Sequence, residues 1–341
     1  MSTTPPPRLA DVAAAAEVSS STASRVLSGS DRVSEELRRR VLAAARELNF
    51  VPNVHAQALA SADTTTVGLV VHDVSDPYFS EIAQGVLRVA GENGRMVLIS
   101  TSHRDPEREL SHIQTLRAHR VSAIVLAGSG FLDSGDTERV AAELEAFEAT
   151  GGRVTMIGRH RLPVDAVLPD NRGGAQEMGR YLLELRHREI GVITGPATLT
   201  TVEDRLTGFR EALADKGVEL PDARIADGDF TRDGGFEAAH ELFDANEGLT
   251  AVFALNDAMA IGAMAALRSR GIAVPDEVSV AGFDDIPAVV DVTPPLTTVR
   301  LDMQTLGATA MGLALRKPTA RPRRRRMQPT LIVRESTRRL S

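Results

Sequence analysis

Short apolar segments recur along residues 67–281, and most are followed by a longer stretch with helical periodicity. Segments that are apolar on both faces are typical of strands buried in a parallel sheet, because the connecting helices cover both faces of that sheet. The alternation predicts an α/β fold with two doubly wound parallel-sheet subdomains. The expected strands cover 67–71, 96–100, 123–127, 154–158, 190–194, 251–254 and 278–281, and the expected helices cover 78–92, 107–119, 138–149, 175–185, 203–214, 234–245 and 258–269.

The composition is that of a globular protein, and the length of 341 residues allows two or three domains. No apolar run of about 18 residues is present, so no transmembrane helix is expected. The first residues, MSTTPPPRLADV, lack the apolar segment of a secretory signal, and we therefore expect a cytoplasmic protein. The absence of cysteine excludes disulfides, thiolate metal sites and cysteine nucleophiles.

Two short helices joined by a tight turn are predicted over residues 9–28. Each has an apolar face, and the hydroxyl groups of Ser19 to Thr22 can cap the start of the second helix. This pattern is typical of a helix-turn-helix, whose second helix enters the major groove of DNA. An ordinary pair of packed helices is the alternative, because Glu17 stands in the turn where such motifs usually place glycine.

A third amphipathic helix is predicted over residues 34–48, with Ser34 as its cap. Residues 1–50 would then form a three-helix α-helical headpiece. Residues 54–61 can form a further short helix, but an isolated helix of this length is marginal in water. We expect this linker to fold only when two copies of it pack together on DNA.

The net charge of −7 does not lie in the headpiece, because residues 1–61 contain seven arginines and six carboxylates. Phosphate contacts dominate DNA affinity, so a net charge of +1 gives these residues only a weak electrostatic footprint for DNA. The densest basic run, residues 321–326, is predicted to be a solvated surface loop and not a nucleic-acid patch.

Motifs along nearly the whole chain resemble the LacI/GalR family of bacterial transcription repressors. They are ADVA and VSSSTASRVL near the N-terminus, ELNFVPN after the third helix, NDAMAIG at 256–262, GFDD at 282–285 and TPPLTTV at 293–299. The resemblance implies a sequence-specific DNA-binding regulator, most simply a repressor, that binds a pseudo-palindromic operator as a homodimer. It also implies that a small effector is held in a core similar to periplasmic sugar-binding proteins. No heptad pattern follows Ser336, so a dimer is expected and not a coiled-coil tetramer.

The same resemblance implies the domain organisation. A helix-turn-helix headpiece occupies 1–50, a hinge helix and linker occupy 51–63, and an effector-binding and dimerisation core occupies 64–341. Strands are exchanged within that core, so that each subdomain is discontinuous. The N-subdomain is expected at about 64–162 and 295–322, and the C-subdomain at about 163–294 and 323–341.

The family pattern places Ser20 and Ser21 at the base-reading start of the recognition helix. Arg25 lies about one turn further on and can fork onto a guanine, with a phosphate or surface position as the alternative. Leu59 matches the family's minor-groove leucine, an apolar wedge that kinks the duplex; membership of a small helix core is the alternative. The remaining expected DNA-binding residues are Thr22, Ser24 and Ser28, which would contact phosphate or cap the helix, and Asn53 at the start of the linker.

Several effector-binding candidates follow expected strands, where ligands of doubly wound folds bind. Arg205 matches the family's effector-binding arginine, and its guanidinium can donate two hydrogen bonds to vicinal hydroxyls or to a carboxylate. Asn256 and Asp284 each follow an apolar strand, where helix capping or turn formation is the alternative role. Tyr78 or Phe79 could stack on a sugar ring, with a place in the core as the alternative for each. Phe230 matches a pocket aromatic of the family's second subdomain, and Asp76 and Asn171 complete the set of candidates.

These side chains predict a sugar or sugar derivative as effector, with a purine or another small metabolite as the alternative. The effector would change DNA binding if it prefers one subdomain arrangement, and either release or strengthening satisfies that requirement. A periplasmic sugar-binding protein would need a signal peptide and would lack the headpiece. No phosphate loop, nucleophile elbow or zinc-protease motif is present, so we expect no enzymatic activity, cofactor or metal site.

Overall fold

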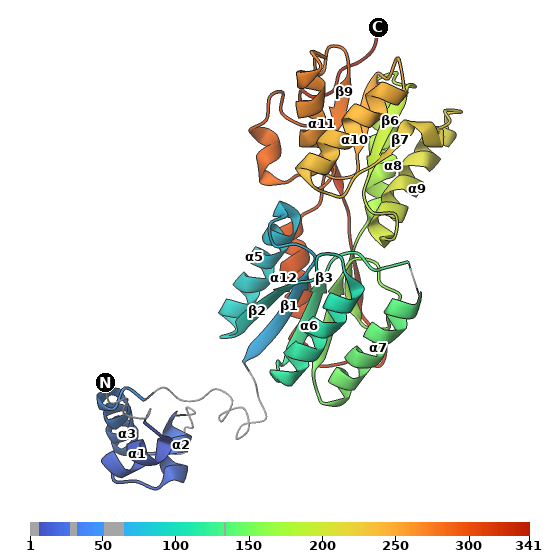
Figure 1. The fold of residues 1–341 in the computed structure, drawn as a ribbon. Helices are drawn as coiled ribbons and strands as arrows, with labels where there is room; N and C mark the ends of the chain where they lie inside the picture. The colour runs from blue at the N-terminus through green and yellow to red at the C-terminus, as the bar shows by residue number, and fades with distance from the viewer. Residues whose placement is uncertain (1–6, 28–32, 51–64, 133) are drawn as a thin grey trace. The chain divides into compact units, whose positions relative to one another are not determined.

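The computed structural model describes residues 7–27, 33–50, 65–132 and 134–341. Contacts within the chain divide it into two compact units, Met1–Thr64 and Thr65–Ser341, which we call the headpiece and the core unit (Figure 1).

Three helices form the described part of the headpiece: α1 (Leu9–Ala15), α2 (Ser20–Leu27) and α3 (Glu35–Glu47). They pack around a small core of valine and alanine, which lets the helices approach closely. The predicted helix pair and third helix are thus confirmed. Ser34 holds the predicted N-cap position of α3, but it makes no side-chain capping bond there. Glu35 and Glu36 in the first turn instead place negative charge beside the positive end of the helix dipole.

A parallel six-stranded sheet forms the first lobe of the core unit, with the strand order β11-β5-β4-β3-β1-β2. Val67, Leu69 and Val71 of β1 pack in the same cluster as α5, whereas Val70 packs in the cluster that contains α6 and α7. Alternate residues therefore serve opposite sheet faces, as a doubly wound fold requires. The elements are β1 (Thr66–Val71), α5 (Pro77–Glu92), β2 (Met96–Thr101), α6 (Pro106–Ala118), β3 (Ala123–Ala127), α7 (Ser134–Ala149), β4 (Arg153–Ile157), β5 (Asp165–Pro169), α12 (Met303–Ala314) and β11 (Arg324–Met327).

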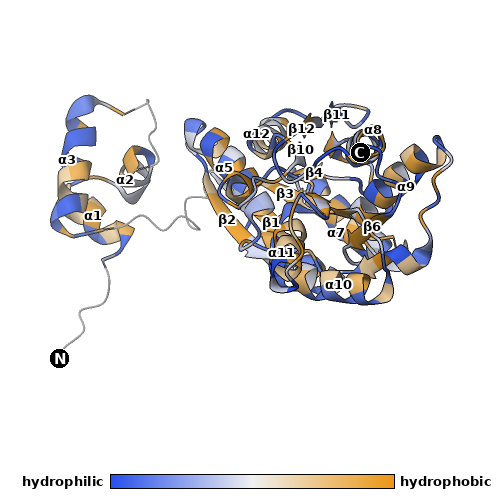
Figure 2. Ribbon diagram, turned by 90° about the horizontal axis from the view of Figure 1, so that it is seen from above, coloured by the Kyte–Doolittle hydropathy of each residue, from blue (hydrophilic) through white to orange (hydrophobic). Residues whose placement is uncertain are grey.

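The second lobe contains a parallel four-stranded sheet in the order β7-β6-β8-β9. Its helices pack in two pairs, α8 with α9 and α10 with α11. Figure 2 shows apolar colour along the central strands of the core unit and hydrophilic colour on outward-facing helix turns. The elements are α8 (Asn171–Glu184), β6 (Ile190–Thr194), α9 (Thr200–Ala214), η1 (Asp222–Arg224), β7 (Ile225–Asp227), α10 (Arg232–Ala245), β8 (Ala251–Ala254), α11 (Asp257–Ser269), β9 (Ser279–Ala281) and η2 (Pro287–Val290).

The chain passes between the lobes after β5, after β10 (Thr298–Arg300) and after β11, and β10 pairs with β12 (Thr330–Ile332). The predicted subdomain boundaries are therefore wrong by several residues. β5 pairs with β4, and β11 pairs with β5, so both strands belong to the first lobe although they were assigned to the C-subdomain. Thr297 was assigned to the N-subdomain, but its carbonyl oxygen accepts a hydrogen bond from the Gly282 N–H (2.9 Å) in the second lobe. Each crossing follows the end of a strand, so a boundary drawn before the strand comes too early.

The structure also contains elements that the periodicity did not predict, namely α12 and the short strands β5, β7, β10, β11 and β12. α12 is apolar over most of its surface because it packs against α5 and against three strands of the first sheet. The basic run at 321–326 is solvated as predicted, but its second half forms the edge strand β11 and not a loop.

Candidate functional site

The turn between α1 and α2 is built around Glu17, whose φ of +52° lies in the left-handed region that favours glycine. Its N–H and that of Val18 donate to carbonyl oxygens in the last turn of α1 (3.1 and 2.9 Å), the Schellman arrangement that closes a helix. Arg40 of α3 donates to the Ala16 carbonyl (2.6 Å) and to the Glu17 carboxylate (3.3 Å). The glutamate in the turn is therefore linked to the third helix.

The start of α2 presents polar side chains. Ser19 Oγ accepts a hydrogen bond from the Thr22 N–H (3.1 Å), so a serine hydroxyl caps this helix as predicted. Ala23 and Val26 are buried in the headpiece core and fix which face of α2 remains outside. Among the predicted DNA-binding residues, Ser20, Ser21 and Arg25 are exposed, and Thr22 and Ser24 are half-buried.

Three further predicted DNA-binding residues, Ser28, Asn53 and Leu59, lie outside the described residues, as does the predicted hinge at 51–63. Their roles stay predictions.

Polar residues of the core unit converge where strands of both lobes end. Asp76 follows β1, and its Oδ1 accepts from the Tyr78 N–H (3.0 Å) at the start of α5. Asn256 follows β8, and its Oδ1 accepts from the Met259 N–H (2.9 Å) at the start of α11. Both residues also line a cavity together with Asp284, which follows β9. Helix capping and cavity lining, which were alternatives for Asn256 from the sequence, therefore occur together in that residue.

Arg205 of α9 organises the floor of this cavity, and only 3% of its surface is exposed. Its Nε donates to Asn171 Oδ1 (2.9 Å), and one terminal nitrogen donates to Asp284 Oδ1 (2.7 Å). The other terminal nitrogen donates to the Leu255 carbonyl oxygen, and the guanidinium lies over the Phe283 ring at 3.8 Å from its centroid. These contacts hold the guanidinium in one orientation.

Burial controls the protonation of the acidic groups in the cavity. It raises the pKa of Asp284 to about 7, against the opposing effect of Arg205. It also raises the pKa of Asp76, because the hydrogen bond from Tyr78 and the charge of Arg104 offset only part of the desolvation. The pKa of the Tyr78 hydroxyl is raised by burial and by the charge of Asp284. Tyr78 is therefore a neutral group that can donate a hydrogen bond at pH 7.

The predicted aromatic candidates separate into two groups. Tyr78 and Phe230 line the cavity. Phe79 is 5% exposed and packs in the core, with its ring edge-on to His72 and Tyr78, so the prediction that it stacks on an effector is wrong. Asn171 is also buried and supports Arg205 from behind without lining either of the cavities described below.

The cleft contains two adjoining chambers. The inner chamber has a volume of about 40 Å³ and is lined by Asp76, Tyr78, Arg205, Asn256 and Asp284, among others. The outer chamber has a volume of about 300 Å³ and is lined by Asp73, Ser75, Thr231, Arg232, Ala258, Ile261 and Ile286, among others. Three residues belong to both linings, namely Asp76, Arg104 and Phe230.

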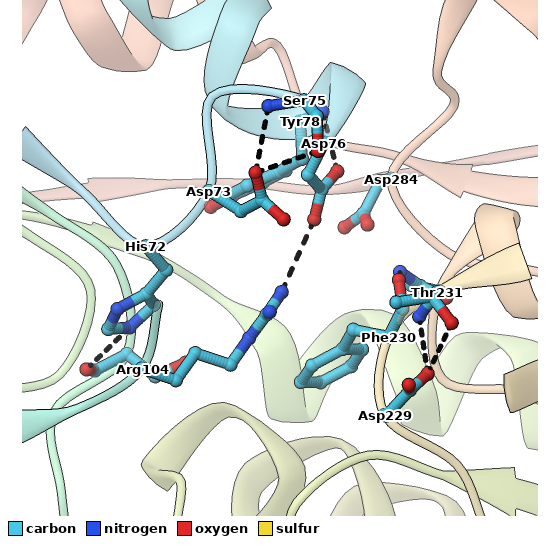
Figure 3. Close-up of polar contacts among 12 residues, drawn as sticks. His72, Asp73, Ser75, Asp76, Tyr78, Arg104, Asp229, Phe230, Thr231 and Asp284 are labelled. Carbon is cyan, nitrogen blue, oxygen red and sulfur yellow. Dashed lines mark hydrogen bonds and ion pairs between the residues drawn. The ribbon is translucent and has the colours of Figure 1, made fainter. Parts of the chain in front are cut away.

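Several lining residues were missed from the sequence. Arg104 and Ser129 lie just beyond the expected strands at 96–100 and 123–127, so the rule that ligands bind at strand ends would have indicated them. Arg104 contacts Asp76 (3.5 Å) and lies over the Phe230 ring at 5.3 Å from its centroid. Figure 3 shows its guanidinium between these two side chains. Thr201 and Thr231 sit at helix starts, and nothing in their local sequence distinguishes them from other capping residues.

Contacts across the cleft hold the two lobes together on one side. Ser129 Oγ donates to Thr201 Oγ1 (2.6 Å), and Phe131 forms an isolated antiparallel bridge with Leu199. Arg159 of the first lobe donates to the carboxylate of Asp204 (3.0 Å) on α9. The distance between the lobes is therefore set by specific polar pairs, which a ligand in the cleft can reinforce or oppose.

Within the residues that the structure describes, no group of three or more histidine, cysteine or carboxylate side chains could hold a metal ion. Among the same residues, no helix has both the length and the apolar character to cross a membrane.

The fold and its cleft define a class of protein in which a helix-turn-helix headpiece is joined to a two-lobed ligand-binding core. Residues 8–53 match the family of bacterial regulatory proteins described as the lacI family, and residues 180–337 match the periplasmic binding protein-like domain. The transcriptional regulator DegA of Bacillus subtilis (strain 168) is 34% identical over 332 residues, which cover 96% of this chain and 97% of DegA. The chain therefore belongs to the LacI family of bacterial transcriptional regulators.

Solved structures agree with this assignment. A complex of the transcriptional regulator CelR with cellobiose is 32% identical, covers 97% of this chain and 99% of its own, and has a TM-score of 0.71. A dimer of the Lac repressor bound to operator and the anti-inducer ONPF is 27% identical, covers 98% and 99%, and has a TM-score of 0.81. The chain is thus a DNA-binding regulator, and its relatives are regulators and not enzymes.

Proposed function

We propose that this regulator represses transcription and that a sugar bound in the cleft changes its affinity for operator DNA. The observation that carries the proposal is the set of groups around Arg205. A fixed guanidinium, the Asp284 carboxylate, the Asn256 amide and the Tyr78 hydroxyl converge on one small chamber. Such a mixture of donors and acceptors suits the paired hydroxyls of a sugar, and the Phe230 ring supplies an apolar face. The similar CelR structure holds cellobiose, which supports the same ligand class.

The DNA contacts of this proposal lie on α2. Ser20, Ser21 and Arg25 are exposed at the helix that the family places in the major groove. Arg25 has the reach to contact a guanine edge, whereas the serines are short. Thr22 and Ser24 would contact phosphates, and Leu59 would act as the minor-groove wedge.

A homodimer is the proposed assembly. The edge strand β2 and the adjacent α5 expose Met96, Ile99 and Leu87, which are 56%, 41% and 44% exposed. Figure 2 shows the apolar colour of β2 at this edge of the core unit. An exposed apolar edge of this kind is typical of an interface between identical subunits. The similar Lac repressor is a dimer bound to operator, which supports a pseudo-palindromic site. We propose the bacterial cytoplasm as its location.

Two measurements on the full chain test this function. Selection from random duplex DNA at fixed salt should yield a two-fold related site, and a thermal-shift screen should find a sugar that stabilises the core. That sugar should then change the dissociation constant for the selected site. Stabilisation by a purine and by no sugar would contradict the proposed effector class, and a selected site without two-fold symmetry would contradict the proposed assembly.

A further inference from the structure

We propose that the effector is a neutral sugar of two units, and that Arg104 is the specificity residue at the junction between them. This inference rests on the proposed sugar-binding function and specifies the size, charge and recognition of the ligand. Three independent observations support it: the backbone at Arg104, the division of the cleft, and the arrangement of charges.

The backbone around Arg104 is strained. His103 and Arg104 both have positive φ angles, +53° and +59°, although neither residue is glycine. The loop is fixed by hydrogen bonds from the His103 N–H to the His72 carbonyl (2.7 Å) and from the Asp105 N–H to the Ser102 carbonyl (3.1 Å). Left-handed conformations of ordinary residues persist where the surrounding structure enforces them, and they cluster at ligand sites. Here this conformation accompanies a long cationic side chain that extends into the cleft (Figure 3).

Arg104 lies in the wall between the two chambers. The inner chamber of about 40 Å³ is too small for a whole sugar ring while the guanidinium remains on Asp76. The outer chamber, at about 300 Å³, reaches by itself only the lower end of the range for small-molecule sites, which is roughly 300–1,000 Å³. Rotation of Arg104 away from Asp76 would join the chambers into one elongated site. A ligand that fills it has one unit beside Arg205 and a second unit beside Thr231 and Ile261.

The charges in the cleft favour a neutral ligand. Arg104 is flanked by the carboxylates of Asp73, Asp76 and Asp229, which all interact electrostatically with it. Arg205 is paired with Asp284 at 2.7 Å. The remaining arginine of the linings, Arg232, contacts Asp233 at 2.7 Å. A phosphate or carboxylate placed at Arg104 would face three carboxylates, whereas hydroxyl, ring and glycosidic oxygens can accept from its N–H groups without adding charge.

The experiment measures dissociation constants of the full chain by isothermal titration calorimetry. The probes are the neutral disaccharides cellobiose, maltose and lactose, their component monosaccharides glucose and galactose, and the anion glucose 6-phosphate. We expect one disaccharide to bind at least about tenfold more tightly than either of its component monosaccharides, and glucose 6-phosphate to bind no better than glucose. Equal affinity for disaccharide and monosaccharide, or tighter binding of the phosphate, overturns the proposal.

Variants then test the residue itself. Arg104→Ala should weaken binding of the preferred disaccharide about tenfold, the loss expected for one or two hydrogen bonds from a charged donor, and weaken binding of the better monosaccharide by a clearly smaller factor. Arg104→Lys should recover only part of the loss, because an ammonium lacks the planar fork of donors. The control is Arg108→Ala, an exposed arginine of α6 whose ion-pair contact is to Asp105. An equal loss for both ligands, or no loss, overturns the assignment of Arg104.

The outcomes also separate this inference from the function on which it rests. Binding of monosaccharides alone, with a normal response of operator affinity, overturns the two-unit ligand and leaves the regulator function standing. Binding of no sugar, together with stabilisation by a different metabolite, overturns both.

Discussion

The headpiece and the cleft both carry functional polar side chains on helices, but the exposure of those side chains differs. On α2, Ser20, Ser21 and Arg25 are exposed. In the cleft, Arg205 is 3% exposed and bonds to Asn171 and Asp284. Substitutions at exposed positions usually change stability little, whereas breaking a buried charged network changes it strongly. Binding and stability should therefore be separable in the headpiece and coupled in the cleft.

The largest expected effect comes from Arg205→Ala, which leaves the buried Asp284 carboxylate without its partner. We expect the free energy of unfolding of the core to fall by about 3–5 kcal/mol and the effector response to be lost, while folded protein still binds operator. Urea unfolding of the full chain measures the first, and operator titration with and without effector measures the second. The matched control is Arg210→Ala on the same helix, whose side chain is 43% exposed and pairs with Asp222. A control that loses as much stability would contradict the coupling.

If Leu59 is the proposed wedge, Leu59→Ala should weaken specific operator binding by at least about tenfold, because nonspecific phosphate contacts alone would remain. The affinity for effector should not change. Titration of the selected operator and of an unrelated duplex at one salt concentration measures the effect. Equal operator affinity in wild type and variant would contradict the wedge.

Arg25→Ala should cost about 1–3 kcal/mol of discrimination between operator and a variant site, the range of one bidentate contact to a base. Ser21→Ala should cost less, because a serine hydroxyl has a shorter reach and makes a single contact. Because both side chains are exposed, the melting temperature should change much less in these variants than in Arg205→Ala. A uniform loss on every duplex would instead indicate that Arg25 contacts phosphate.

The smallest effect is expected at the turn. Glu17→Gly should stabilise the headpiece by up to about 1 kcal/mol, since glycine adopts the left-handed conformation without strain. The side chain of Glu17 is 86% exposed, so its ion pair with Arg40 offsets little of this gain. Thermal unfolding of the full chain, followed through the headpiece transition, measures the change. A clear loss of stability would show that the contact with Arg40 outweighs the strain.

The rule that ligands bind beyond strand ends located Asp76, Asn256 and Asp284 from the sequence, because apolar strands are easily recognised. Arg104 also follows a strand, but the chain first bends through two left-handed residues, His103 and Arg104 itself. Phe79 was assigned to the cleft because the residues before α5 indicate where the helix starts but not which face its first turn presents. The predicted crossing points are wrong because β5 pairs with the preceding strand β4, and because β11 pairs with β5, a strand far earlier in the chain.

The sequence by itself determined the class of fold, the helix-turn-helix and the family, because hydrophobic periodicity and ordered motifs are local properties that survive in one dimension. Only the tertiary structure decided how the cleft is assembled. The contacts of Arg205 join residues 34, 50 and 79 positions away, and the wall of the two chambers joins Asp76 and Arg104 to Phe230. Burial sets the charge and orientation of these groups, and burial follows from packing between distant segments rather than from any local pattern.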